Sequence, residues 1–352
     1  MVSRSVESVD QERVSPSPRA APDPYGNATH QTVGIVDTNA VLSSVDNDCR
    51  HGWNSRLLRS TAFDSTTLYA ADHVYREIYR RLPKIAESSP VPVADLRARF
   101  ETEYLPAMRF VTMSAEDKPH PQVLAIADLD DRPTGQLALL IAPVIVFSED
   151  KHLKRPGFAP MNWRAAAGFT AAVAEAAIQE RATAVALSLP VVGIWSGSGV
   201  LGRRLGVPRW LPGAALVAFL SLGAYHRLLD PARRATVIDI GGKFAGTFFG
   251  LLAEQSRLKH AGLAGISNII FSPASEDPSV RRRVAIILAR SPKALLAREV
   301  RELIVVNFDG TSVPSLEQVR SALTDGSEFV CVDRYRWQFG RKVGALPLTQ
   351  KG

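Results

Sequence analysis

Short apolar runs alternate with longer stretches of helical periodicity in the first half of the chain. The run Val33–Val36 ends at Asp37, a second run lies near Arg109–Met113, and a third is Ala142–Phe147. Apolar runs of this length, bounded by polar residues, are typical of buried strands. Strands that alternate with helices predict an α/β fold for residues 31–160, with a parallel sheet flanked by helices. In such sheets, ligands bind at the carboxyl ends of the strands.

Two helices of this region have clear sequence signals. One is predicted to follow Asp72, whose side chain suits the N-cap position. Val74, Ile78 and Leu82 then recur every four residues and form one apolar face. A second helix is predicted after Asp131, because an Arg-Pro pair follows and proline suits the first helical turn.

The middle of the chain, residues 164–266, changes to an apolar helical composition. Residues 182–201 and 210–226 contain no Asp, Glu, Lys or Arg, and about twenty apolar residues are enough to span a bilayer. We expect a helical hairpin that crosses a membrane. Arginines are more frequent at its outer ends than in its link, which places both termini in the cytoplasm. Pro190 and the Gly and Ser residues of the first run favour the alternative, a soluble pair of buried helices.

Residues 278–343 are expected to form a small α+β domain. Helices are predicted at Val280–Leu288, Lys293–Leu303 and Val313–Leu323, followed by two strands within Glu328–Arg341 that meet near residues 333–334. Three helices followed by a β-ribbon resemble a winged helix-turn-helix. In that fold the third helix enters the major groove of DNA and the wing touches the backbone or the minor groove.

The winged-helix resemblance implies a set of polar and basic contacts to nucleic acid. The residues that would face bases are Glu317, Gln318, Arg320 and Ser321, and those that would contact phosphates are Arg334, Arg336 and Arg341. Many winged helices bind only proteins, so a protein-interaction module is the alternative.

The charge of the chain adds a preference for polyanions. Its 352 residues have a formal net charge of +7, which favours nucleic acid or acidic lipid as a partner, although a solvated basic surface gives the same value.

The two cysteines, Cys49 and Cys331, lack metal-type spacing and suit a reducing compartment. Residues 1–30 are rich in Ser, Pro and charge, lack the apolar segment of a secretory signal, and are expected to be a disordered tail.

Four carboxylates stand at the ends or on the faces of the predicted elements. Asp37 ends the first strand, Glu77 lies beside the apolar helix face, Asp131 precedes the Arg-Pro pair, and Asp150 follows the last strand. Each has an ordinary structural alternative: an N-cap for the aspartates, and an i, i+4 ion pair with Arg81 for Glu77. Carboxylates gathered in one cleft repel one another unless cations bind.

The order of these motifs resembles the PIN-domain nucleases. The matching pattern is strand-Asp-Thr-Asn, an acid in an Arg-rich helix, Asp-Asp-x-Pro opening a helix, and strand-Ser-x-Asp-x-x-Leu. The resemblance implies that Mg²⁺ or Mn²⁺ ions bound by the acids hydrolyse phosphodiester bonds in RNA. The implied metal ligands and catalytic residues are Asp37, Glu77, Asp131 and Asp150, the supporting residues are Thr38, Asn39 and Ser148, and the phosphate contacts are Arg80, Lys151 and Lys154.

Two features of the chain depart from the family's pattern. Many members carry an aspartate two residues after the last acid, where this chain has His152. The third motif offers Asp128, Asp130 and Asp131. We choose Asp131 because it stands directly before Arg-Pro, and Asp130 is the alternative ligand.

The sequence therefore predicts a metal-dependent endoribonuclease, a hydrolase tethered to a membrane and carrying a winged-helix module. PIN nucleases are often the toxins of toxin–antitoxin pairs, which implies an inhibitory protein partner, and they commonly form homodimers. The alternative hypothesis is a non-catalytic nucleic-acid-binding or regulatory protein that acts through the C-terminal winged helix, and His152 favours it.

Overall fold

The computed structural model describes residues 32–113, 120–192, 250, 253–273, 278–308 and 312–343, and of residues 182–192 the backbone alone. The predicted tail and the apolar run 210–226 lie outside these residues, as does the part 193–201 of the run 182–201. None of the described helices combines the length and the apolar character that crossing a membrane requires. The membrane hairpin stays a prediction, without support from the described residues.

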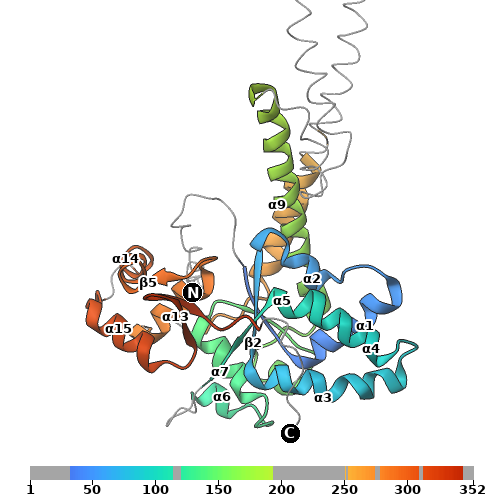
Figure 1. The fold of residues 1–352 in the computed structure, drawn as a ribbon, viewed down its shortest axis with the longest axis horizontal. Coiled ribbons are helices and arrows are strands. Elements are labelled where there is room, and N and C mark those ends of the chain that lie inside the picture. Colours follow the sequence, from blue (N-terminus) through green and yellow to red (C-terminus); the bar gives the residue numbers. More distant parts are fainter. Residues whose placement is uncertain are drawn as a thin grey trace, which may run out of the picture.

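Four parallel strands form the central sheet, in the order β3-β2-β1-β4 (Figure 1). In β1, Gly34 lies opposite Leu68 on one side and Ile145 on the other. The predicted parallel sheet flanked by helices is confirmed. The strand bounds are β1 (Thr32–Val36), β2 (Thr66–Ala71), β3 (Met108–Val111) and β4 (Ile145–Phe147).

The hydrophobic pattern does not predict β2, although this strand lies inside the sheet. Its sequence, TTLYAA, begins with two polar threonines and ends with two alanines, which suit a helix, and a helix follows directly. All residues from Leu68 to Ala71 are buried. The strand forms because β1 and β3 pair with it on both sides. These partners are distant in sequence, so the local hydrophobic pattern gives no information about them.

Helices cover both faces of the sheet (Figure 1). The helices α1 (Thr38–His51), α3 (Asp72–Ser88) and α4 (Val93–Arg99) pack on one face, and α7 (Arg132–Ile141) packs on the other. The shorter elements between them are α2 (Arg56–Ser60), the 3₁₀ turn η1 (Ala62–Asp64), the π-helical turn η2 (Phe100–Tyr104), α5 (Leu105–Ala107), α6 (Pro121–Leu124) and α8 (Lys151–Lys154).

The prediction that Asp72 caps α3 is wrong by one residue. The N-cap is Ala71, and no side chain caps the helix there. The Asp72 carboxylate instead accepts hydrogen bonds from Thr112 Oγ1 and, at 3.2 Å, from Arg341 Nη2. The predicted apolar face of this helix is confirmed, because three residues at its spacing are buried: Val74, Ile78 and Leu82.

The C-terminal module, residues 278–343, contains the predicted helices and ribbon with one addition. Its sheet is antiparallel, in the order β5-β7-β6. The second helix begins at Ala297 and not at Lys293, because Leu295 and Leu296 pair with β7 as a short strand. The bounds are α13 (Val280–Arg290), β5 (Leu295–Leu296), α14 (Ala297–Asn307), α15 (Leu316–Asp325), β6 (Phe329–Asp333) and β7 (Arg336–Phe339).

The C-terminal module packs directly on the parallel sheet, beside α7 (Figure 1). The buried hydroxyl of Tyr69 in β2 donates to the carbonyl of Ala289 at 2.9 Å. Arg290 Nη2 donates to the carbonyls of Ile141 at 3.2 Å and Pro143 at 2.7 Å. Apolar residues of β1, α7, α13, α14 and α15 belong to one continuous core. The module and the parallel sheet are therefore parts of one packed unit.

The end of the module also pairs with the edge of the sheet. Phe110 in β3 and Arg341 exchange two backbone hydrogen bonds of 2.8 Å. Gly340 precedes this pair with a φ of 65°, and a Cβ atom there would lie 3.0 Å from the Phe110 carbonyl oxygen. Only glycine combines that backbone conformation with so close an approach.

The long helix α9 (Trp163–Val192) leaves the body of the molecule beside the helix of residues 253–267 (Figure 1). Lys259 Nζ lies 2.8 Å from Glu180 Oε1 across the two helices. A Cβ atom at Gly262 would lie 3.0 Å from the carbonyl oxygen of Phe169. The small residue and the ion pair hold the two helices close together.

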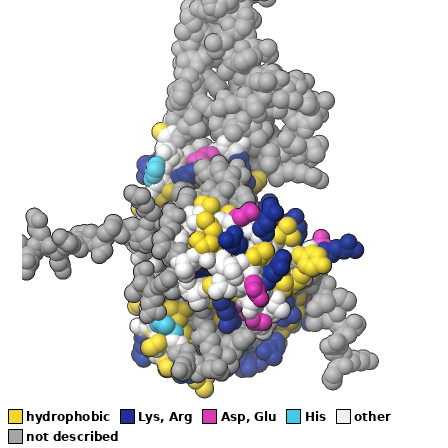
Figure 2. All heavy atoms as spheres, turned by 90° about the vertical axis from the view of Figure 1, so that its left-hand side faces the viewer, with side chains coloured by type: hydrophobic (Ala, Val, Ile, Leu, Met, Phe, Trp, Pro, Cys, Tyr) yellow, Lys and Arg dark blue, Asp and Glu magenta, His cyan; other side chains and the backbone are white. Residues whose placement is uncertain are grey.

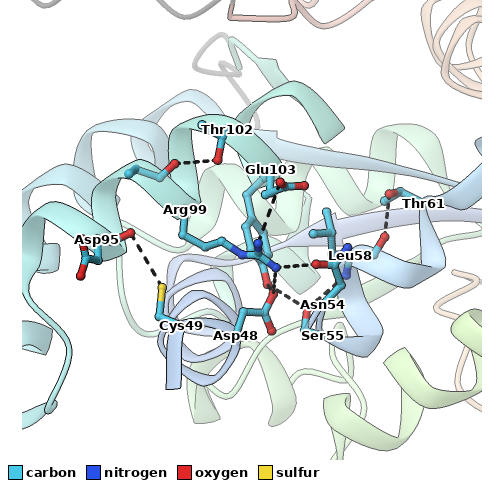
Figure 3. A network of polar contacts seen from close by, with 12 residues as sticks. Asp48, Cys49, Asn54, Ser55, Leu58, Thr61, Asp95, Arg99, Thr102 and Glu103 are labelled. Carbon is cyan, nitrogen blue, oxygen red and sulfur yellow. Dashed lines mark hydrogen bonds and ion pairs between the residues drawn. The ribbon is translucent and has the colours of Figure 1, made fainter. Parts of the chain in front are cut away.

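A buried polar network joins the far end of α1 to η2 (Figure 3). The Asp48 side chain is fully buried and accepts a hydrogen bond of 2.6 Å from the Tyr104 hydroxyl. That hydroxyl also lies 2.8 Å from Ser55 Oγ. Arg99 Nη2 is 3.6 Å from the same carboxylate and also bonds Asn54. The network fixes η2 against the helices α1 and α2.

Candidate active site

Asp37 stands at the carboxyl end of β1, where the strand turns into α1. It is only 3% exposed. Its Oδ1 atom accepts a hydrogen bond of 2.7 Å from the Thr38 amide, and its Oδ2 atom accepts one of 2.8 Å from Ser148 Oγ. The structural alternative also holds in part, since Asp37 is the N-cap of α1. The carboxylate is thus buried and fixed by two donors.

Glu77 reaches the same edge of the sheet from the second turn of α3. Thr38 Oγ1 donates a hydrogen bond of 2.6 Å to Glu77 Oε2. Arg81 Nη1 lies 3.2 Å from Glu77 Oε1, and Arg80 Nη2 lies 3.8 Å from the same atom. Glu77 therefore forms the i, i+4 pair with Arg81 and, through Thr38, also joins the end of β1.

Ser148 links Asp37 to Asp150 at the end of β4. The fully buried Ser148 hydroxyl donates to Asp37 and accepts a hydrogen bond of 2.9 Å from the Asp150 amide. Asp150 is the N-cap of α8, and its Oδ1 atom accepts a hydrogen bond of 2.7 Å from the amide of His152. One hydroxyl thus sets the position of two of the acids.

Asp131 is the N-cap residue of α7. Its side chain makes no cap hydrogen bond, and its Oδ2 atom is buried without a hydrogen-bond partner among the described residues. Asp130 and Asp128 are exposed, and the Asp130 amide donates to Asp128 Oδ1 at 3.0 Å. Of the three aspartates in this motif, Asp131 is the one whose carboxylate is withdrawn from solvent.

The negative charges of the other acids affect the pKa of Asp131. Burial is the main cause that raises the pKa of Asp131 to about 7, and the charges of Asp37 and Asp150, followed by those of Asp128 and Glu77, contribute to this rise. Each additional negative charge disfavours ionisation of the next carboxyl. The acids at this edge of the sheet thus disfavour one another's ionisation, although Arg81 lies 3.2 Å from Glu77 Oε1.

Asp37 has the same kind of perturbation. Burial is the main cause that raises its pKa to about 6, and the hydrogen bonds from Ser148 and Thr38 oppose this rise. The charges of Glu77 and Asp150 raise the pKa again. A carboxyl that holds its proton to pH 6 in spite of two donors is strongly desolvated. Such perturbation is common at functional sites.

The donor chemistry of this site fits a hard divalent cation. Four carboxylates offer the oxygen ligands that Mg²⁺ and Mn²⁺ prefer, and the unpartnered Asp131 Oδ2 is a free acceptor. Within the described residues, however, no group of three or more His, Cys, Asp or Glu side chains is arranged so that it could hold a metal ion. Binding an ion therefore requires the carboxylates to move closer together.

The other residues expected around the acids have mixed positions. Thr38 and Ser148 contact the acids directly, as described above, and Asn39 follows on the same turn and is half-buried. Lys151 is exposed, whereas Lys154 Nζ lies 3.6 Å from Glu149 Oε1. Arg80 is mostly exposed beside Glu77. Lys151 and Arg80 are therefore the basic side chains of this set with most access to a ligand.

His73 is a residue of this region that the sequence reasoning missed. It lies one turn before Glu77 on α3, and its Nδ1 atom is buried without a hydrogen-bond partner among the described residues. Burial lowers its pKa, although the charges of Glu77 and Asp130 raise it. The i, i+4 spacing from Glu77 was the available signal, because it places both side chains on one helix face.

Several residues of the C-terminal module that were expected to contact nucleic acid form hydrogen bonds within the protein instead. Gln318 Oε1 accepts from the Ser315 amide at 2.8 Å as part of a capping box. Arg336 donates to the Ala294 carbonyl at 3.2 Å. Two pairs also bond within the structure, Ser321 with Asp325 and Arg341 with Asp72. Gln318, Ser321 and Arg341 nevertheless remain exposed, as do Glu317, Arg320 and Arg334, and only Arg336 is half-buried.

No protein-family model matches the chain, and neither the curated proteins nor the solved structures contain a match.

Proposed function

We propose that the protein is a divalent-metal-dependent ribonuclease of the PIN type. One observation carries the proposal: Asp37, Glu77, Asp131 and Asp150 come from four separate elements and influence one another at the carboxyl edge of the sheet. A carboxylate cluster of this kind is destabilising unless a cation binds. It is therefore more readily explained as a ligand site than as three independent helix caps and one ion pair.

The four acids have different hydrogen-bond partners, and this suggests that they have different roles. Asp37 is fixed by Ser148 and Thr38 and is the anchor of the ion site. Glu77 is held by Thr38 and Arg81, and Asp150 by the His152 amide. A bound divalent ion would supply an activated water and charge stabilisation for phosphodiester hydrolysis. Water adds to phosphorus and gives up a proton, the bond from phosphorus to the leaving oxygen breaks, and that oxygen takes up one proton in turn.

Asp131 is the acid with freedom to move. Its Oδ2 atom has no hydrogen-bond partner among the described residues, and its pKa of about 7 means that it is partly protonated near neutral pH without an ion. On ion binding it would lose that proton and turn toward the other acids. Arg80 and Lys151, both accessible at the same edge, would contact phosphates of the RNA on either side.

A second candidate is a non-catalytic nucleic-acid-binding or regulatory protein. It is favoured by the lack, among the described side chains, of a group already positioned to hold a metal ion. In that case the acids would keep their raised pKa values in the presence of Mn²⁺, and binding of nucleic acid would depend on the C-terminal module alone.

The test is cleavage of a mixed RNA pool by the full chain with Mn²⁺, Mg²⁺ or EDTA. Asp131→Asn should reduce metal-dependent cleavage by about 100-fold or more, since even indirect partners of metal ligands contribute about 10- to 100-fold. Asp95→Asn is the matched control, because Asp95 is an exposed aspartate on α4. Cleavage that survives EDTA, or equal cleavage by both variants, would contradict the proposal.

A further inference from the structure

The turn between β6 and β7 presents an aromatic side chain on a left-handed backbone. Tyr335 has a φ of 74° and is 78% exposed. This conformation is unfavourable for a bulky residue, and glycine or asparagine usually takes it. The backbone conformation does not explain a tyrosine at this position, so we look for an explanation in the contacts of its side chain.

Phe63, the other aromatic residue with a positive φ among the described residues, has an internal contact of its ring that Tyr335 lacks. Phe63 also has a positive φ, of 54°, but it is half-buried and the Arg181 guanidinium lies 5.5 Å from its ring centroid. Among the described residues, neither the ring nor the hydroxyl of Tyr335 has a comparable contact. The fold holds Phe63 through an internal contact, whereas the Tyr335 ring faces solvent.

The surroundings of Tyr335 favour an anionic ligand with flat rings. Arg334 is exposed beside it and makes no ion pair with a described residue, while its amide donates to Asp333 Oδ1 at 2.6 Å. Val332 is 53% exposed on the same ribbon. Lys and Arg outnumber Asp and Glu in residues 278–343. Figure 2 looks onto the side of the C-terminal module, where basic side chains lie among hydrophobic ones.

We propose that Tyr335 is a stacking platform for a base of single-stranded RNA and that Arg334 contacts the phosphate next to that base. Nucleic acid presents flat rings and negative charges at a regular spacing, which matches an exposed tyrosine beside an unpaired arginine. An unpaired base can lie on the ring, whereas the bases of a duplex are already stacked. This contact is independent of the acids and needs no metal ion.

The test measures two properties of the same full-length variant, Tyr335→Gly. Its melting temperature should rise by roughly 2 °C, because glycine relieves the left-handed backbone. Its affinity for a fluorescein-labelled oligouridylate of about 12 nucleotides, measured in EDTA, should fall by about 5- to 100-fold. Tyr335→Phe should bind like the wild type, since the ring is retained.

The arginine is tested through the salt dependence of binding. Arg334→Gln should lower the slope of log affinity against log salt by about 0.7, the value for one phosphate contact to a single strand. Arg257→Gln, on the helix of residues 253–267, controls for loss of charge elsewhere. Undiminished RNA binding by Tyr335→Gly, tighter binding of an RNA duplex, or equal binding of polyglutamate would overturn the proposal.

Discussion

Ser148 Oγ donates a hydrogen bond of 2.8 Å to Asp37 Oδ2 across 111 residues of sequence. The same hydroxyl accepts the Asp150 amide, so it connects the ends of β1 and β4. These two strands are neighbours in the sheet. Two acids of the candidate site, Asp37 and Asp150, are therefore positioned at the ends of neighbouring strands and joined by one buried serine.

Removing this serine should weaken both the fold and the ion site. Ser148→Ala deletes a hydrogen bond to a buried carboxylate and should lower the free energy of unfolding by about 1.5–3 kcal/mol. The pKa of Asp37 should rise further, because the Ser148 hydrogen bond lowers it. Urea unfolding at pH 8 measures the first effect. A stability equal to that of the wild type would show that the Asp37 carboxylate is held without Ser148.

The raised pKa of Asp37 predicts a particular pH dependence of stability. Its pKa in the folded state is about 6 against an ordinary value of 3.8, so the folded protein keeps this proton to a higher pH than the unfolded chain. Stability contributed by the protonated form is therefore lost as the pH rises from about 4 to 6. Asp37→Asn cannot ionise, so without metal it should exceed the wild type by up to about 3 kcal/mol at pH 8.

The measurement is the difference in unfolding free energy between the two proteins from pH 4 to pH 8 in EDTA. This difference should grow as the pH rises and level off above about pH 6, where Asp37 is ionised in both states. A difference that stays constant with pH would mean that the pKa of Asp37 is not raised in the folded protein.

The network of Figure 3 predicts a large effect from a small change. Tyr104→Phe removes the donor to Asp48 and leaves a fully buried carboxylate with less support, which should cost about 1.5–3 kcal/mol of stability. Tyr79→Phe is the matched control, because its hydroxyl bonds Glu101 in a partly exposed position. Equal losses in the two variants, measured by urea unfolding, would argue against a special role for the buried network.

The joint between the C-terminal module and the sheet predicts a single unfolding transition. Arg290→Met removes the hydrogen bonds to the carbonyls of Ile141 and Pro143 and should lower the stability of the whole unit by about 2 kcal/mol. Tryptophan fluorescence and far-ultraviolet circular dichroism should then change together in urea. Two separate transitions would indicate that the module folds independently of the sheet.

The sequence predicts the local part of this structure well. The strand before Asp37, the apolar face of α3 and the helix after Asp131 each have their signals within a few residues. The link between Asp37 and Asp150 also follows, because both stand at the carboxyl ends of parallel strands, and β1 and β4 are neighbours in the sheet. The strand and helix signals that the sequence gives correctly are those that depend on spacing within a few residues.

Other features depend on partners that are distant in sequence. The strand β2 is stabilised by neighbours on both sides, and the packing of the module rests on contacts such as that of Tyr69 with Ala289, 220 residues apart. Arg336 and Gln318 have the residue types of nucleic-acid contacts, yet they bond atoms of their own module. Their local sequence does not show whether these side chains contact nucleic acid or form hydrogen bonds within the module.

The most direct test of the central claim is a calorimetric titration of the full chain with Mn²⁺ at pH 7. The account predicts saturable binding that releases protons, because Asp37 and Asp131 must ionise when an ion binds. Asp37→Asn should abolish the binding, while Asp95→Asn should leave it unchanged. Absence of saturable binding to the wild type, or equal binding to Asp37→Asn, would contradict the assignment of the four acids as an ion site.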